Sequence, residues 1–202
     1  MKPTIVLIDD HCMIRKGFAA CVTETRGFTV AGEAASLAGA YELFEALPAA
    51  PDVVLLDIGL GEDSGLEFLA YLKEKYPEGG RPAVLVYSIF EDAFRVQSAL
   101  RMGAMGYLSK SAGESEIGLA LDALLEGKTY VESRLFRKID ATPDFFSLLT
   151  RREREILALV QKNHNNSRIA QELGVEVRTI ENYMSRIYDK TGAANRGELV
   201  KL

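Results

Sequence analysis

The sequence has few cysteines, no long apolar run and no internal repeat. Cys12 and Cys21 are its only cysteines, and on one helix they would lie roughly 13 Å apart. This separation is too great for a disulfide, so we interpret both as small, partly buried side chains in a reducing compartment. No apolar run approaches the length of a membrane span and no signal-peptide pattern is present. We therefore expect a cytoplasmic protein with no membrane contact.

Charge is divided unevenly along the 202 residues, whose net charge is −5. Residues 1–142 hold 14 Lys and Arg against 21 Asp and Glu, whereas residues 143–202 hold 10 against 8. The chain is long enough for two modest domains, and its 48% apolar content is typical of globular protein. An acidic block joined to a mildly basic one predicts two domains, of which the second would meet a polyanion.

Apolar, strand-like runs alternate with helical stretches through the acidic block. Five such repeats predict an α/β fold, with a parallel sheet covered by helices on both faces. In such sheets the polar residues that follow the strands meet at one edge, where ligands bind. The residues at these positions are Asp9, Asp10, Asp57, Ser88 and Lys110.

Three carboxylates at one sheet edge predict a site for a hard divalent cation such as Mg2+. Beside such a cation one carboxylate could attack phosphorus, while Lys110 pairs with the phosphate oxygens and Ser88 donates a hydrogen bond. The predicted product is an aspartyl phosphate.

Three helices are predicted in the basic block. The first begins at Thr150-Arg-Arg-Glu153, whose spacing is that of a capping box. The second and third are expected at about Ser167 to Leu173 and Arg178 to Lys190, with Gly174 in the turn between them. This is helix-turn-helix spacing.

The third of these helices has an apolar and a polar face. Ile180, Met184 and Ile187 share the first and are predicted to be core. If the helix enters the major groove of double-stranded DNA, Asn182 could pair with adenine and Glu181 could accept a hydrogen bond from cytosine. Ser185 lies on the same face, and the residues predicted to hold phosphates are Arg178, Thr179, Arg186 and Lys190.

Both blocks resemble one known family. Residues 1–126 resemble the receiver domain of bacterial two-component response regulators, and residues 148–202 resemble the DNA-binding domain of the NarL/FixJ (LuxR-type) group. The second resemblance rests on Asn166 to Ala170, Thr179-Ile180, Lys190-Thr-Gly192 and Asn195-Arg196. Together the two resemblances imply a flavodoxin-like (βα)5 receiver and a small all-α helix-turn-helix domain. Residues 127–147, where the alternation of strands and helices breaks, are interpreted as a linker.

The resemblance also implies a role for the residues at the strand ends. Asp57 would be the phosphoacceptor, Asp10 a direct Mg2+ ligand and Asp9 a pocket residue acting through water. The carbonyl of Gly59 would be a further ligand, and His11 is interpreted as a structural loop residue.

Three more positions match the family's switch and its lysine. Ser88 and Tyr107 would be the switch hydroxyl and the switch aromatic, and Lys110 the lysine that pairs with the phosphoryl group. The implied protein is a transcription factor whose receiver takes a phosphoryl group from a histidine kinase. Phosphorylation would draw Ser88 and Tyr107 inward and favour a DNA-binding homodimer. The receiver would catalyse only its own phosphorylation and dephosphorylation, so we do not expect an enzyme.

Several positions depart from the family's pattern. Gly61 stands where the family usually has Pro, which predicts a looser loop, and Ser111 stands where a Pro is frequent. Phe90 occupies a position that tunes access of hydrolytic water, which motivates the hypothesis of a long-lived phosphorylated form. Glu176 and Glu181 predict weaker attraction to phosphates, so pairing on two half-sites would be needed.

Three alternatives remain beside this interpretation. A phosphatase of the haloacid dehalogenase type also uses an aspartyl nucleophile, but it needs a second carboxylate where Gly59 stands. A flavodoxin-like electron carrier is disfavoured because three carboxylates would face the flavin phosphate. A DNA-binding regulator whose receiver is not phosphorylated in the cell is left open by the sequence.

Overall fold

A computed structural model describes residues 2–61, 63–77, 80–140, 148–191, 193 and 195–200. The chain forms two compact units, Met1–Lys138 and Ile139–Leu202. Residues 141–147 of the predicted linker, Gly192 of the family motif and residues 201–202 lie outside the described residues. Within the described ranges, none of the helices combines the length and the hydrophobicity that crossing a membrane requires.

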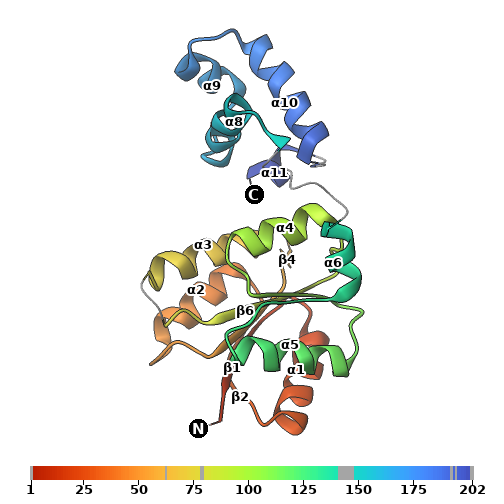
Figure 1. The fold of residues 1–202 in the computed structure, drawn as a ribbon. Coiled ribbons are helices and arrows are strands. Elements are labelled where there is room, and N and C mark those ends of the chain that lie inside the picture. The colour runs from red at the N-terminus through yellow and green to blue at the C-terminus, as the bar shows by residue number, and fades with distance from the viewer. Residues whose placement is uncertain are drawn as a thin grey trace. The chain divides into compact units, whose positions relative to one another are not determined.

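The first unit is a parallel sheet with helices on both faces, as predicted (Figure 1). Its strand order is β2-β1-β3-β6-β7-β8, and each neighbouring pair is parallel. The strands of this sheet are β1 (Thr4–Ile8), β2 (Thr29–Ala34), β3 (Val53–Leu56), β6 (Ala83–Ser88), β7 (Gly106–Ser109) and β8 (Tyr130–Val131). The helices are α1 (Cys12–Thr25), α2 (Leu37–Ala46), α3 (Leu66–Lys75), α4 (Ala93–Arg101), α5 (Glu114–Leu125) and α6 (Ser133–Asp140).

The central strands are apolar along their length because both of their faces are covered. Helices α1 and α5 lie on one face, and α2, α3 and α4 lie on the other (Figure 1). On the α1/α5 face, Phe18 and Leu121 pack into one cluster with Leu7, Leu55 and Leu85 of the sheet. This core holds the strands in register and so fixes where their carboxyl ends lie.

The sheet has one strand more than the five that the sequence predicts. β8 pairs with β7, and α6 follows it, so part of the segment expected to be a linker packs on the first unit. Leu135 of α6 is fully buried, and the backbone N–H of Glu132 donates to the carbonyl of Tyr107. A strand of two residues is too short for its apolar periodicity to be recognised, which is why the sequence did not reveal it.

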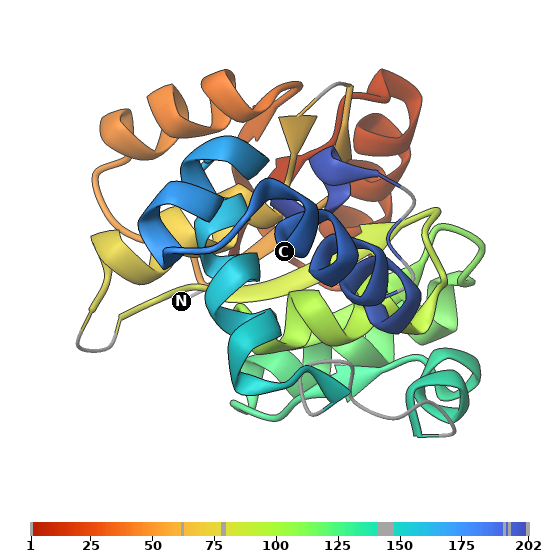
Figure 2. The ribbon, with the colours of Figure 1, turned by 90° about the horizontal axis from the view of Figure 1, so that it is seen from above.

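The second unit consists of helices α8 (Arg151–Gln161), α9 (Asn166–Leu173), α10 (Val177–Thr191) and α11 (Arg196–Val200), coloured blue-green to blue in Figure 2. The predicted capping box is present: the Glu153 N–H donates to the Thr150 hydroxyl, and the Thr150 N–H donates to the Glu153 carboxylate. Gly174 ends α9 with a φ of 65°, the left-handed conformation that glycine adopts without strain. This turn sets α10 against α9, as a helix-turn-helix requires.

Candidate functional site

The register of the sheet brings the predicted strand-end residues to one edge. Ile8 lies opposite Leu56 in the neighbouring strand, and Ser88 lies opposite Ser109. The residues that follow these pairs, Asp9, Asp57 and Lys110, therefore emerge side by side. The sequence prediction that these side chains converge is confirmed by their contacts.

Lys110 is the cation at the centre of this edge. Its Nζ lies 2.6 Å from Asp9 Oδ2 and 2.6 Å from Asp57 Oδ2, and the three side chains are only 7%, 1% and 3% exposed. Burial lowers the pKa of Lys110, but its hydrogen bonds and attraction to the two carboxylates outweigh that effect and raise the pKa overall. The ammonium therefore stays charged throughout the physiological range.

Asp57 is held by two further donors. Its Oδ1 accepts from the Ser88 hydroxyl at 2.8 Å and from the Gly59 N–H at 3.0 Å. The chain can turn back tightly after Asp57 only because residue 65 is glycine: a Cβ on Gly65 would lie 2.2 Å from the Asp57 carbonyl oxygen. The carboxylate is thus fixed in orientation before any ligand arrives.

The loop after Asp57 makes a contact with Asp10 that the sequence does not indicate. Strands β4 (Gly59–Leu60) and β5 (Asp63–Ser64) pair as a small antiparallel hairpin, and the Gly61 N–H donates to Asp10 Oδ2 at 3.2 Å. Gly61 has a φ of 62°, which proline cannot adopt, and proline has no N–H to donate. Gly61 thus joins the loop to Asp10, and the expectation of a looser loop stays a prediction.

His11 lies among the carboxylates. Its Nδ1 is 2.6 Å from Asp10 Oδ1 and 3.3 Å from Asp9 Oδ1. Asp9, Asp10, His11 and Asp57 each place one ligand atom within 4.8 Å of the others, among the residues that the structure describes. The only sign of this in the sequence is the position of His11 directly after the two carboxylates.

A cavity of about 250 Å³ opens onto this edge. It is lined by Asp10, His11, Asp57, Gly59, Phe90 and Lys110, with Ile14, Gly61 and Ile89 at its border. Asp9 lies behind it, almost fully buried. The donor set suits Mg2+, since the carboxylates of Asp10 and Asp57 face a space large enough for a hydrated ion.

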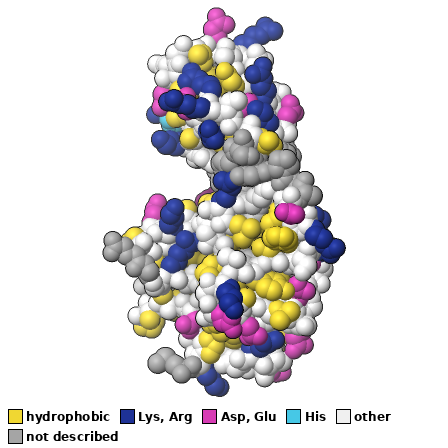
Figure 3. Space-filling model, in the orientation of Figure 1, with side chains coloured by type: hydrophobic (Ala, Val, Ile, Leu, Met, Phe, Trp, Pro, Cys, Tyr) yellow, Lys and Arg dark blue, Asp and Glu magenta, His cyan; other side chains and the backbone are white. Residues whose placement is uncertain are grey.

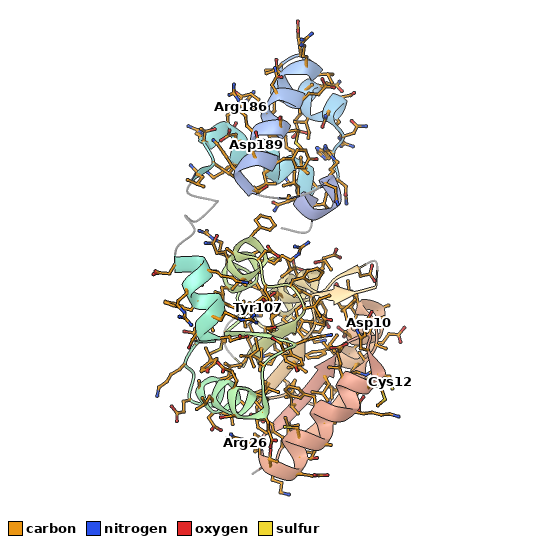
Figure 4. The ribbon with its side chains drawn as sticks, turned by 90° about the vertical axis from the view of Figure 1, so that its right-hand side faces the viewer. Asp10, Cys12, Arg26, Tyr107, Arg186 and Asp189 are labelled. Carbon is orange, nitrogen blue, oxygen red and sulfur yellow. The ribbon has the colours of Figure 1, made fainter. Side chains whose placement is uncertain are left out.

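Ser88 and Tyr107 are already directed inward. Tyr107, labelled in Figure 4, is fully buried, and its hydroxyl donates to the Phe90 carbonyl at 2.7 Å. Burial raises the pKa of Tyr107, so this hydroxyl keeps its proton. Both residues therefore lie inward in this structure, since the Ser88 hydroxyl also bonds Asp57, and their movement on phosphorylation stays a prediction.

In the second unit, α10 has the two faces that the sequence predicts. Ile180, Met184 and Ile187 are buried. The side chains exposed to solvent are Arg178, Glu181, Asn182, Ser185 and Arg186, and Thr179 is half-buried. Figure 4 labels Arg186 and Asp189 on this helix, and Lys and Arg side chains gather on the visible face of this unit, at the top of Figure 3.

Lys190 has a structural partner that the sequence did not indicate. Its Nζ lies 2.7 and 2.9 Å from the two carboxylate oxygens of Glu153, which is buried at the start of α8. Burial raises the pKa of Glu153, but the hydrogen bonds from Lys190 and Thr150 outweigh it and lower the pKa overall. A DNA phosphate would have to compete with this ion pair for Lys190.

Both units match known protein families. Residues 5–122 match the response regulator receiver domain, and residues 147–202 match the bacterial regulatory proteins of the luxR family. The oxygen regulatory protein NreC of Staphylococcus aureus is 31% identical over 210 residues, which cover 98% of this chain and 94% of NreC.

Solved structures with the same fold include DNA complexes. RcsB bound to DNA as two dimers on two parallel DNAs has a TM-score of 0.68 at 20% identity, over 99% of this chain and 96% of RcsB. A LuxR-family response regulator from Aurantimonas sp. SI85-9A1 has a TM-score of 0.63 at 26% identity, over 69% of this chain and 96% of that protein.

Proposed function

This chain is a response regulator transcription factor of the NarL/FixJ type, and we propose that its receiver is phosphorylated on Asp57 by a histidine kinase to control DNA binding. The observation that carries the proposal is the geometry of Asp57. Its carboxylate borders the cavity, one oxygen faces Lys110, and the other accepts from Ser88 and Gly59.

The chain's own residues perform most of the proposed phosphoryl transfer. An oxygen of Asp57 forms the bond to phosphorus as the bond between phosphorus and the kinase histidine nitrogen breaks, and that nitrogen leaves with the electron pair. The Lys110 ammonium, 2.6 Å from Asp57 Oδ2, pairs with this carboxylate before the transfer. Once the phosphoryl group is attached, the Lys110 ammonium and the Ser88 hydroxyl are close enough to pair with its oxygens.

Receiver domains bind Mg2+ through acidic residues, and this acidic cluster fits that ion. We assign Asp10, Asp57 and the Gly59 carbonyl as direct ligands, with Asp9 acting through water because it lies behind the cavity. Bound there, Mg2+ would neutralise charge that develops on the phosphoryl oxygens.

The second unit would read DNA with α10. Asn182 and Glu181 would contact bases, while Ser185, Arg178, Thr179 and Arg186 would contact the backbone or base edges, as would Lys190 if released from Glu153. One helix with so few free cations binds weakly, so a homodimer on two half-sites is required. We place the protein in the cytoplasm, where a kinase and DNA are both accessible.

The test measures DNA binding with and without phosphorylation. Wild type and Asp57→Asn are incubated with a small phosphoryl donor and Mg2+, and binding to mixed-sequence duplex DNA is followed by fluorescence anisotropy. Phosphorylation should strengthen binding by wild type and leave Asp57→Asn unchanged. Equal binding under all four conditions would show that the receiver does not control DNA binding through Asp57.

A further inference from the structure

A polar cluster joins the loop after Ser88 to helix α6. Its five members, which we call the α6 clasp, are Glu91, Ser109, Ser111, Arg134 and Lys138. Glu91 belongs to the loop between β6 and α4, the two serines follow or end β7, and the two cations lie on α6. Three segments far apart in the sequence therefore meet at one carboxylate, at the edge of the sheet where α6 lies (Figure 1).

The Glu91 carboxylate accepts hydrogen bonds from both other segments of the α6 clasp, the end of β7 and helix α6. Its Oε1 lies 2.7 Å from the Ser109 hydroxyl and 2.6 Å from Arg134 Nη2, and its Oε2 lies 3.3 Å from Lys138 Nζ. Lys138 also donates to the Glu91 carbonyl at 3.2 Å. The Ser109 hydroxyl, with Arg134 and Lys138, lowers the pKa of Glu91 in spite of the opposing effect of burial.

The remaining contacts tie the α6 clasp to β7. Arg134 Nη2 also donates to the Ser111 hydroxyl at 3.1 Å, and the two serine hydroxyls lie 2.8 Å apart. Glu132, just before α6, accepts from the Ser109 N–H at 3.0 Å and from Arg134 Nε at 3.2 Å. Helix α6 is thus held in its first turn by Arg134 and in its last turn by Lys138.

The loop that carries Glu91 is also held by contacts near the phosphorylation site. Ser88 bonds Asp57, and two residues later the Phe90 carbonyl accepts from Tyr107. Glu91 is the next residue, so its position depends on both contacts. If Ser88 left Asp57, the loop would shift, and Glu91 could not keep four contacts that depend on distances of 2.6 to 3.3 Å.

We propose that Glu91 couples the phosphorylation site to α6, so that the α6 clasp is closed when Ser88 bonds the Asp57 group and opens when it does not. This inference rests on the proposed function, because a phosphoryl group on Asp57 would strengthen the hold on Ser88. Helix α6 ends at Asp140 and the second unit begins at Ile139. A change in how firmly α6 is held would therefore directly affect the segment that enters the DNA-binding unit.

The first test follows backbone amide exchange of peptides that contain residues 133–138, with and without a small phosphoryl donor and Mg2+. In wild type, phosphorylation should slow this exchange about three- to fivefold, the range expected for a few partly exposed charged contacts. Glu91→Gln and Arg134→Gln should take up the phosphoryl group but lose the slowing. Arg137→Gln is the matched control, because Arg137 lies on the same helix and bonds only the Ser133 carbonyl among the contacts described.

Two outcomes would overturn the coupling. One is exchange over α6 that does not change when wild type is shown by mass to be phosphorylated. The other is a Glu91→Gln protein that keeps the full slowing.

A second test separates the coupling from the proposed function. Ser88→Ala removes the hydroxyl that bonds Asp57, and in unphosphorylated protein it should speed exchange over residues 133–138. Ser98→Ala, a buried serine of α4, is its control and should leave α6 unchanged. If wild type takes up no phosphoryl group, the proposed function fails, but the Ser88→Ala result still decides the coupling: unchanged exchange over α6 would refute it.

Discussion

Phe90 should set the lifetime of the phosphorylated receiver. Its ring lines the cavity beside Asp57 and packs so closely on the loop that a Cβ on Gly59 would lie 3.1 Å from it. The Arg95 guanidinium lies over the ring at 4.2 Å from its centroid, which holds the ring in place. Water approaching Asp57 from this side must therefore pass the ring.

Replacing Phe90 with Asn should open this route. The smaller side chain leaves room for about two more waters in the cavity, and its amide can orient one of them toward phosphorus. We expect the dephosphorylation rate to rise about tenfold, which corresponds to about 1.4 kcal/mol in the barrier. The cation–π contact that is lost contributes only about 0.5–1 kcal/mol, so the receiver should remain folded.

The assay is the decay of the phosphorylated mass after the donor is removed, in the presence of Mg2+. Ile89→Asn is the matched control: Ile89 borders the same cavity but is 67% exposed, so its loss opens no new route. An unchanged decay rate in Phe90→Asn, or equal acceleration in both variants, would show that the Phe90 ring does not limit the access of water to Asp57.

Three further perturbations test other contacts. Lys110→Met leaves two buried carboxylates without a cation, so it should lower the free energy of unfolding in urea by about 3–5 kcal/mol without Mg2+; a loss below about 1 kcal/mol would contradict this. Because the pKa of Glu153 is lowered on folding, its contribution is present above the ordinary value of 4.5 and is lost as pH falls below it. As the pH falls, the amide NMR signals of α8 and α10 should therefore disappear before those of the first unit. Glu153→Gln should weaken this dependence on pH. Identical pH profiles for wild type and Glu153→Gln would argue against the ion pair with Lys190. Glu181→Lys should tighten binding to mixed-sequence DNA and steepen its salt dependence by about one unit of slope, whereas unchanged affinity would place α10 away from the DNA.

The features of the fold that depend on local sequence patterns were predictable from the sequence. Four-residue apolar runs identified the buried strands, and the polar residues that end them converge because parallel strands share an edge. The capping box at Thr150 and the two faces of α10 were predictable for the same reason, since each depends on residues within a few turns of one another.

Contacts between distant segments were not predictable. Glu91 and Arg134 are separated by 43 residues, and nothing in their local sequence pairs them. Lys190 appeared to be a phosphate contact because its partner Glu153 lies 37 residues away. The hydrogen bond from the Tyr107 hydroxyl to the Phe90 carbonyl joins positions 17 residues apart, and the sequence around Tyr107 does not indicate it. Such pairings follow from the folded core and can be recognised only in three dimensions.

Control of DNA binding by the receiver depends on one step, the transfer of a phosphoryl group to Asp57. Its most direct test is the intact-protein mass of wild type and Asp57→Asn after incubation with a small phosphoryl donor and Mg2+. We predict that wild type gains the mass of one phosphoryl group and that Asp57→Asn gains none. A wild-type protein that binds Mg2+ but gains no mass, or a variant that gains as much as wild type, would contradict the assignment of Asp57.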